Sequence, residues 1–266
     1  MTRALTIALV LAAPLAAHAE DDSFLEAIVS SGPRTAVAVD RSWLYNDASR
    51  VAAPGHAIGL ARVTYGTGSP TRAFAGNTGT AGGLLEIGGE VGLADRLSAV
   101  AIGAQGEDAG GSAQTGGMLG LRWSVLPGST RSTHLVLSGG FLRELEGHSG
   151  AWGRLTLGHD AGRARLTASL HGERIFTSGR DSVDVMVTAG ATVPLTESVR
   201  AGLEYVGQDL EGVLGDETEG GARHILGPVV SAVLWSQRVS LVGGPALALG
   251  AGQARALGRV AVACQF

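Results

Sequence analysis

The sequence predicts an all-β fold, a transmembrane antiparallel up-and-down β-barrel of about 12 strands, with a short N-terminal helix and extension. Three observations predict it. Apolar and polar residues alternate with a period of two along most of the chain, which is the pattern of a strand with unlike faces. The alternating stretches are about 9 to 14 residues long, near the length of a strand that crosses a bilayer. Finally, short and long connections between the stretches alternate in order.

The first 19 residues have the features of a secretory signal peptide. Arg3 supplies a positive charge, an apolar run follows from Leu5 to Leu15, and Ala17-His18-Ala19 offers a small-x-small cleavage site. We therefore expect cleavage before Glu20 and export of the mature chain. The apolar run is too short for a membrane-spanning helix, which needs ~20 residues.

Residues 20–55 differ in pattern from the rest of the chain. Asp22-Ser23 precedes apolar residues at helical spacing between Phe24 and Val29, which predicts a short capped helix. The residues from Arg34 to Pro54 have no clear period. We expect residues 20–55 to form a periplasmic extension or a plug for a barrel made by residues 56–266.

The strands are predicted from alternation. Between Val183 and Val193, valine or alanine occupies every odd position, whereas the even positions carry polar or small residues and Met186. The same pattern predicts twelve strands near 56–65, 84–93, 97–106, 114–126, 133–146, 151–159, 163–176, 183–193, 199–209, 222–235, 238–249 and 254–265. Because 97–106 and 222–235 alternate poorly, the sequence leaves their faces open.

The connections fall into two sets. Counted from the C-terminus, the tight links 94–96, 160–162, 194–198 and 236–237 lie on one side of the predicted barrel. The long links 66–83, 107–113 and 210–221, which are rich in Gly, Thr, Asp and Glu, lie on the other. Some connections are shorter or longer than the others on their side of the barrel. Successive connections nevertheless alternate between the two sides.

The C-terminal strand carries a further signal. Phe266, Cys264, Val262 and Val260 share one face, and the chain ends on the aromatic residue. In these features residues 56–266 resemble bacterial outer-membrane β-barrel proteins. The resemblance implies an outer-membrane location, contact with outer-membrane lipids and lipopolysaccharide, and assembly by the outer-membrane machinery that reads Phe266. The aromatic residues are few, and Trp123, Phe141, Phe176, Tyr205 and Trp235 are the candidates for aromatic girdles.

Composition excludes several functions. All 20 basic residues are arginine, so a Walker-type phosphate loop and Schiff-base chemistry, which need lysine, are excluded. The net charge of −4 argues against binding of nucleic acid. No pair of histidines sits at metal-ligand spacing with a carboxylate, and Cys264 is the lone cysteine, so we expect no metal, no cofactor and no enzyme activity. His148-Ser149 is the weak catalytic alternative, and Asp216 to Glu219 is a weak cation site.

The face opposite the apolar one carries the candidate functional residues. If apolar side chains face lipid, seven arginines and six acids face the lumen, together with two histidines. These residues are Arg62, Glu86, Glu90, Arg122, His134, Glu144, Arg154, Arg165, His171, Glu173, Asp184, Arg200, Glu204, Arg255 and Arg259. Charges buried in this number need partners or water.

Several functions fit these residues. The leading one is a narrow passive channel for small polar solutes, in which Glu204 and Arg259 lie near the constriction. The alternatives are a structural or surface-exposed protein with a closed lumen, a lipid-modifying enzyme, and an autotransporter-like barrel. A secreted β-sandwich or adhesin would account for the strands but not for their length or even number.

Overall fold

The computed structural model describes residues 50–66, 83–107, 111–126, 133–145, 147–178, 183–208, 210, 223–235, 238–250 and 253–266. Within these ranges the chain forms twelve strands: β1 (Ala57–Gly66), β2 (Gly83–Ala94), β3 (Leu97–Glu107), β4 (Ala113–Leu126), β5 (Thr133–Arg143), β6 (Ser149–Ala161), β7 (Ala164–Ile175), β8 (Asp184–Pro194), β9 (Val199–Gln208), β10 (Arg223–Leu234), β11 (Val239–Gly250) and β12 (Gln253–Gln265). None of the described residues belongs to a helix long and apolar enough to span a membrane.

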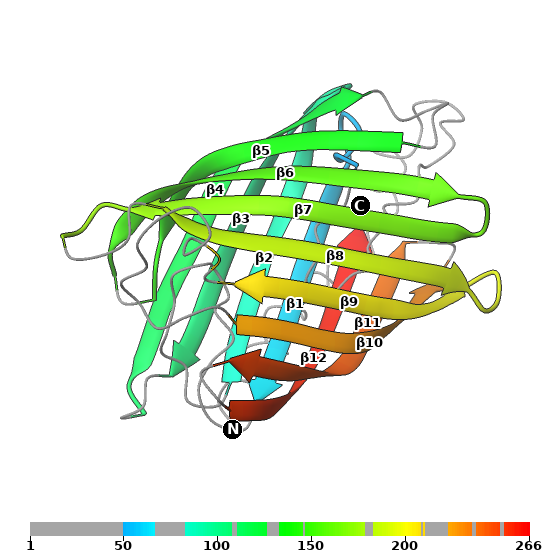
Figure 1. Cartoon of the computed structure of the whole chain (residues 1–266). Coiled ribbons are helices and arrows are strands. Elements are labelled where there is room, and N and C mark those ends of the chain that lie inside the picture. Colours follow the sequence, from blue (N-terminus) through cyan, green and yellow to red (C-terminus); the bar gives the residue numbers. More distant parts are fainter. Residues whose placement is uncertain are drawn as a thin grey trace, which may run out of the picture. The chain divides into compact units, whose positions relative to one another are not determined.

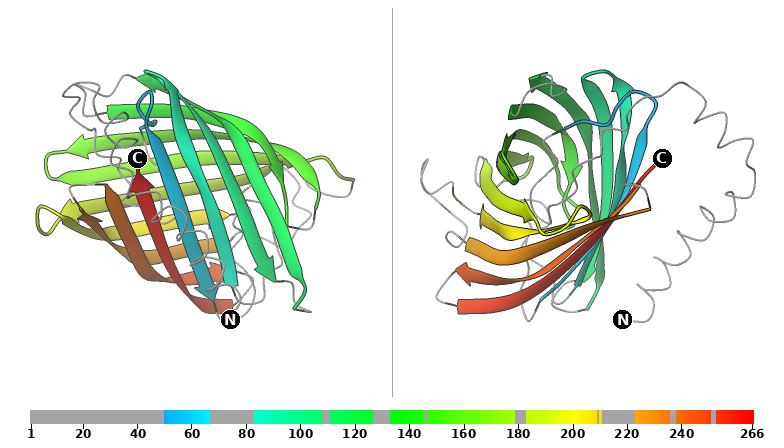
Figure 2. Two further views of the ribbon diagram at one scale, coloured as in Figure 1. Left: turned by 180° about the vertical axis from the view of Figure 1, so that it is seen from behind. Right: turned by 90° about the vertical axis from the view of Figure 1, so that its right-hand side faces the viewer.

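The strands form one closed antiparallel barrel (Figures 1 and 2). Each strand pairs with its neighbours in sequence, and β1 pairs with β12, so the predicted fold class and strand number are confirmed. The pairing of β1 with β12 closes the barrel, and we call it the closing seam. The last residue extends this seam: Phe266 N donates to Ala57 O at 2.8 Å, and Ala57 N donates to Phe266 O at 3.2 Å. Closure removes the sheet edges, whose unpaired backbone groups would be costly in lipid.

The observed strands match the predicted stretches closely. The largest difference is in β5, which was predicted to reach residue 146 and ends at Arg143. The chain reverses earlier because Glu144 N donates to His148 O at 2.9 Å and Gly147 N donates to Glu144 O at 3.0 Å. Gly147 supplies the positive φ of 95° that this turn requires. The next strand, β6, consequently begins at Ser149 rather than 151.

The pleat assigns the two faces as the alternation predicts. Outward residues such as Leu170 and Leu203 are 53% and 57% exposed on the protein surface, whereas inward Ser169 and Glu204 are buried. The poorly alternating strands are apolar on both faces. In β3, Val100, Ile102 and Ala104 share the inward face of Ser98. In β10 the buried inward residues include Ile225 and Val229.

The barrel has two distinguishable ends. Ala57 and Phe266 lie at one end, which we call the terminal end, and the tight connections after β2, β6, β8 and β10 lie there too. The opposite end, which we call the loop end, carries the long connections. Exposed aromatic residues mark both ends: Trp123, Trp235 and Phe266 at the terminal end, and Tyr65, Phe141 and Phe176 at the loop end.

Several predictions fall outside the described residues. These are the signal peptide at 1–19, the helix after Asp22, the acidic loop at 216–219 and the side chain of Arg255.

Candidate functional site in the barrel lumen

Charged side chains meet in separate clusters on the inner wall. The first cluster lies across the closing seam, where Glu86 of β2 accepts hydrogen bonds from Arg62 of β1 at 3.3 and 3.4 Å and from Arg259 of β12 at 2.9 Å. Register explains the contact, since Arg62 is directly opposite Glu86 and β12 is the other neighbour of β1. Glu86 is 2% exposed, so one buried carboxylate balances two guanidinium groups.

The second cluster surrounds Glu90, four residues nearer the terminal end. Ser98 Oγ donates to Glu90 Oε1 at 2.7 Å, the backbone N of Ala52 donates to the same oxygen at 2.8 Å, and Arg122 donates to Oε2. All four groups are buried. Hydrogen bonds from several donors to one carboxylate are the condition under which a buried charge is tolerated.

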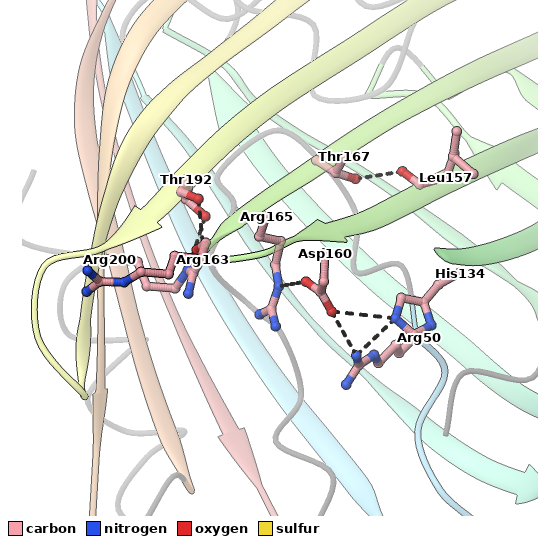
Figure 3. Close-up of polar contacts among 9 residues, drawn as sticks. All are labelled: Arg50, His134, Leu157, Asp160, Arg163, Arg165, Thr167, Thr192 and Arg200. Atoms are coloured by element: carbon pink, nitrogen blue, oxygen red, sulfur yellow. Dashed lines mark hydrogen bonds and ion pairs between the residues drawn. The ribbon is translucent and has the colours of Figure 1, made fainter. Parts of the chain in front are cut away.

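The third cluster lies at the terminal end of β5, β6 and β7 (Figure 3). Asp160 accepts a hydrogen bond from Arg165 Nε at 2.8 Å and another from Arg50 Nη2 at 3.3 Å, while Arg50 Nη2 lies 3.0 Å from His134 Nε2. Asp160 is therefore shared by two arginines from different parts of the chain. Nearby, Arg200 donates to Thr192 Oγ1 and to the carbonyl oxygen of Arg163.

Arg50 and Ala52 belong to residues 50–56, which we call the inner segment. It is held against the inner face of β2, where Pro54 bridges Gly92, Gly55 N donates to Gly92 O and Gly92 N donates to His56 O. The glycine at 92 is required, because an added Cβ would overlap the carbonyl oxygen of Ala53. Because one end of the segment touches β2 and Arg50 reaches β5 and β6, the segment lies inside the terminal end of the lumen.

The fourth cluster combines a histidine with an aromatic ring. Arg154 Nε donates to His171 Nδ1 at 3.0 Å, and His171 Nε2 lies 2.5 Å from Glu173 Oε1. Trp152 stacks on His171 with ring centroids 6.0 Å apart. Packing and hydrogen bonds together fix this imidazole in one orientation.

The wall formed by β8 to β12 combines apolar and polar residues. Its buried apolar side chains form two clusters; one contains Met186, Val206, Ile225, Ala246 and Leu257, and the other Val229, Val242 and Ala261, while Asp184 and Glu204 are buried on the same strands. The charged clusters around Glu86, Glu90, Asp160 and His171 lie mainly on β1 to β7 and are joined from β12 by Arg259. The charged clusters therefore gather on one side of the lumen, whereas buried apolar clusters line both sides.

The structure places the predicted lumen residues on the inner face, apart from Arg255, whose side chain is not described. Glu204 and Arg259, predicted near a constriction, are both buried, and Arg259 binds Glu86. Sequence reasoning missed Asp160, which had been assigned to a turn, and Arg50, which lies in a stretch without a period. Asp160 could have been identified from its position. It is an even number of residues from Arg154 and Thr156, and side chains at that spacing in one strand lie on the same face. Among the described residues, no three His, Cys, Asp or Glu side chains are grouped so as to hold a metal ion.

Comparison with known proteins extends these observations. No protein-family model and no curated protein matches the sequence. Among solved structures, the COG4313 outer membrane channel from Pseudomonas putida aligns with 10% identity and a TM-score of 0.56, covering 82% of this chain and 98% of that one. The translocator domain of the autotransporter NalP from Neisseria meningitidis aligns with 15% identity and a TM-score of 0.45, covering 95% and 98%. OprD from Pseudomonas aeruginosa aligns with 15% identity and a TM-score of 0.40, covering 79% and 66%.

The structural likeness to the COG4313 channel bears on the fold. Together with the closed antiparallel barrel, it shows that the chain has the fold of the β-barrel proteins of the bacterial outer membrane.

Proposed function

We propose that the protein is a narrow passive channel for small polar solutes across the outer membrane. The observation that carries the proposal is the inner wall of β1 to β7, on which arginine and acidic side chains lie at successive depths. A barrel interior that served stability alone would be expected to be apolar, because replacing buried ion pairs by packed apolar residues is often neutral or stabilising. The fold likeness to a protein described as an outer membrane channel supports the same proposal.

Barrel size fits a narrow path. About eight strands leave an interior filled by side chains, and 16 to 18 strands leave an open aqueous channel. With twelve strands, the diameter falls between these limits, so side chains set the width. The path then runs from the loop end past Glu86, past Glu90 and past Asp160 to the terminal end.

The inner segment favours a second candidate, a structural barrel with a closed lumen. Its contacts with Glu90 and Gly92 tie it to β2, and its contacts with His134 and Asp160 tie it to β5 and β6. In the channel proposal this segment narrows the terminal end, whereas in the second candidate it seals that end.

Single-channel recording in planar bilayers separates the two. We expect measurable conductance from the mature protein, and a larger conductance after deletion of residues 20–55, which removes Arg50 and Ala52. The matched control is Arg163→Gln, since Arg163 is an exposed residue of a terminal-end turn. The absence of conductance in both the mature and the deleted protein, each verified as folded by a heat-shift gel, would leave the closed barrel.

Ion selectivity tests the same proposal at the level of residues. Replacing Glu204 with Gln removes one negative charge at nearly constant volume, so reversal potentials under a salt gradient should shift toward anions. Replacing Arg259 with Gln should shift them toward cations. Unchanged reversal potentials in both variants would mean that neither residue lines the conducting path.

A further inference from the structure

The outer surface of β5, β6 and β7 has an unusual composition at the loop end. Two rows of residues that lie opposite one another cross these strands there. In the upper row, which is nearer the loop end, Arg143 is opposite Ser149, and Ser149 O accepts a hydrogen bond from Phe176 N. In the lower row Phe141 is opposite Ala151, and Ala151 is opposite Arg174. The two arginines and the two phenylalanines thus occupy alternate corners around the small side chains of β6.

These corner residues point outward. Phe141 and Phe176 are 65% and 61% exposed, and Arg143 and Arg174 are exposed as well. The two arginines are separated by two strand spacings and by two residues along the strand, roughly 12 Å between Cα atoms. Side chains of this length can therefore bring both guanidinium groups to one ligand above Ser149 and Ala151.

Among the residues that the structure describes, no acid neutralises the two arginines. Within the described residues, neither guanidinium takes part in an ion pair or a hydrogen bond with another side chain. The nearest outward acid on the described strands toward β3 is Glu107, which pairs with Ala113 on β4. Arg143 pairs with Gly117, which is also on β4, four residues after Ala113. Along the strands, Glu107 is therefore roughly 13 Å from the row of Arg143.

A row of glycines lies directly below this patch, toward the middle of the membrane. Gly139, Gly153 and Gly172 form the next outward row across the same strands. An added Cβ at Gly153 would meet nothing nearer than the carbonyl oxygen of Ser138 at 4.0 Å, so the space above it is open. The row after it is apolar, with Leu137, Leu155 and Leu170 exposed on the surface.

We propose that this surface, formed by Arg143, Arg174, Phe141, Phe176 and the row of three glycines, binds one lipid A moiety of lipopolysaccharide. The loop end of an outer-membrane barrel faces the outer leaflet. The arginines match the phosphate groups of lipid A, because a planar guanidinium binds phosphate oxygens bidentately. The glycine row and the leucine row below it accept an acyl chain, and the phenylalanines flank the boundary between head group and chain.

The charge complementarity distinguishes lipid A from a zwitterionic lipid. Two cations that have no acidic partner among the described residues attract an anionic head group at the membrane boundary, and the attraction is strong because the surroundings are poorly solvated. The open space above Gly153 adds a shape requirement, since a head group alone would not occupy it. The proposal is independent of whether the lumen conducts.

The test is native mass spectrometry of the folded, detergent-solubilised protein titrated with purified diphosphoryl lipid A. We expect one tightly bound molecule on the wild type. Arg143→Gln combined with Arg174→Gln should weaken binding by at least about tenfold, as expected for loss of two charge-assisted contacts. The matched control is Arg96→Gln combined with Arg163→Gln, which removes the same charge from exposed turns at the terminal end and should leave binding unchanged.

Two further arms test the chemistry of the ligand. Dephosphorylated lipid A should bind the wild type as weakly as diphosphoryl lipid A binds the double arginine variant. Gly153→Leu, which fills the open row without a backbone clash, should weaken binding while both arginines remain. A heat-shift gel verifies that each variant is folded.

Two results would overturn the proposal. One is wild-type affinity for lipid A in the folded Arg143→Gln, Arg174→Gln variant. The other is equally tight binding of phosphatidylglycerol with the same dependence on both arginines, which would assign the surface to anionic phospholipid in general.

Discussion

Replacement of Glu86 by Gln tests whether the seam cluster holds the barrel together. The substitution keeps the size of the side chain, so no cavity forms, but it removes the negative charge that two guanidinium groups share. Removing one partner of a buried ion pair costs about 3–5 kcal/mol, because the remaining charge stays buried. The Arg259 side chain is 6% exposed, whereas that of Arg62 is 17% exposed and reaches some water. We therefore expect the lower value, about 3 kcal/mol of unfolding free energy.

The assay is reversible urea unfolding in lipid vesicles, followed by the fluorescence of the four tryptophans. The matched control is Glu107→Gln, an exposed carboxylate at the end of β3, which should change the free energy of unfolding by less than about 0.5 kcal/mol.

A double-mutant cycle with Arg259→Gln isolates the interaction. Once Glu86 is neutral, Arg259→Gln should cost less than it does in the wild type, because it then removes a repulsive charge. A loss below about 0.5 kcal/mol for Glu86→Gln, or strict additivity in the cycle, would refute the reasoning and indicate a fully hydrated cluster.

Three further outcomes are expected. Deletion of Phe266 removes both backbone hydrogen bonds to Ala57 and the terminal aromatic residue, so a heat-shift gel of membrane fractions should show less folded protein; an unchanged yield would contradict this. Leu203→Arg places a cation in lipid at a cost of about 2–4 kcal/mol, whereas Thr188→Arg faces the lumen and should cost less in a folding titration; equal costs would mean that the faces are misassigned. Gly92→Ala should displace the inner segment and make the chain cleavable by trypsin after Arg50, whereas Gly83→Ala, which has open space around it, should not; protection in both variants would contradict the role of Gly92.

Much of the fold could be predicted from local pattern. Alternation at Val183 to Val193 is sufficient to identify a strand and its two faces, because the pleat sends successive side chains to opposite sides. Alternation failed in β3 and β10, since Val100 and Ile225 are apolar and nevertheless face the lumen. In such strands the face is chosen by hydrogen-bonded register with the neighbours, which a single stretch of sequence does not contain.

The candidate site could be predicted only as a set of inward charges. The sequence indicated that Glu86, Arg62 and Arg259 share one face of their strands, but not that they meet. Nor did it indicate that Arg50 reaches Asp160, because the segment before β1 has neither a period nor a motif.

What the sequence by itself determined is therefore local: strand identity, the alternation of faces, the side on which each connection lies and the aromatic end. These properties depend on neighbours in the chain. Tertiary structure decided the partners. Closure brings Arg259 beside Glu86, 173 positions earlier, and register sets Arg143 and Arg174 around Ser149 on the outer surface. The physical reason is that ion pairs and shared ligands need distances of a few Å, which are fixed only when separate strands align.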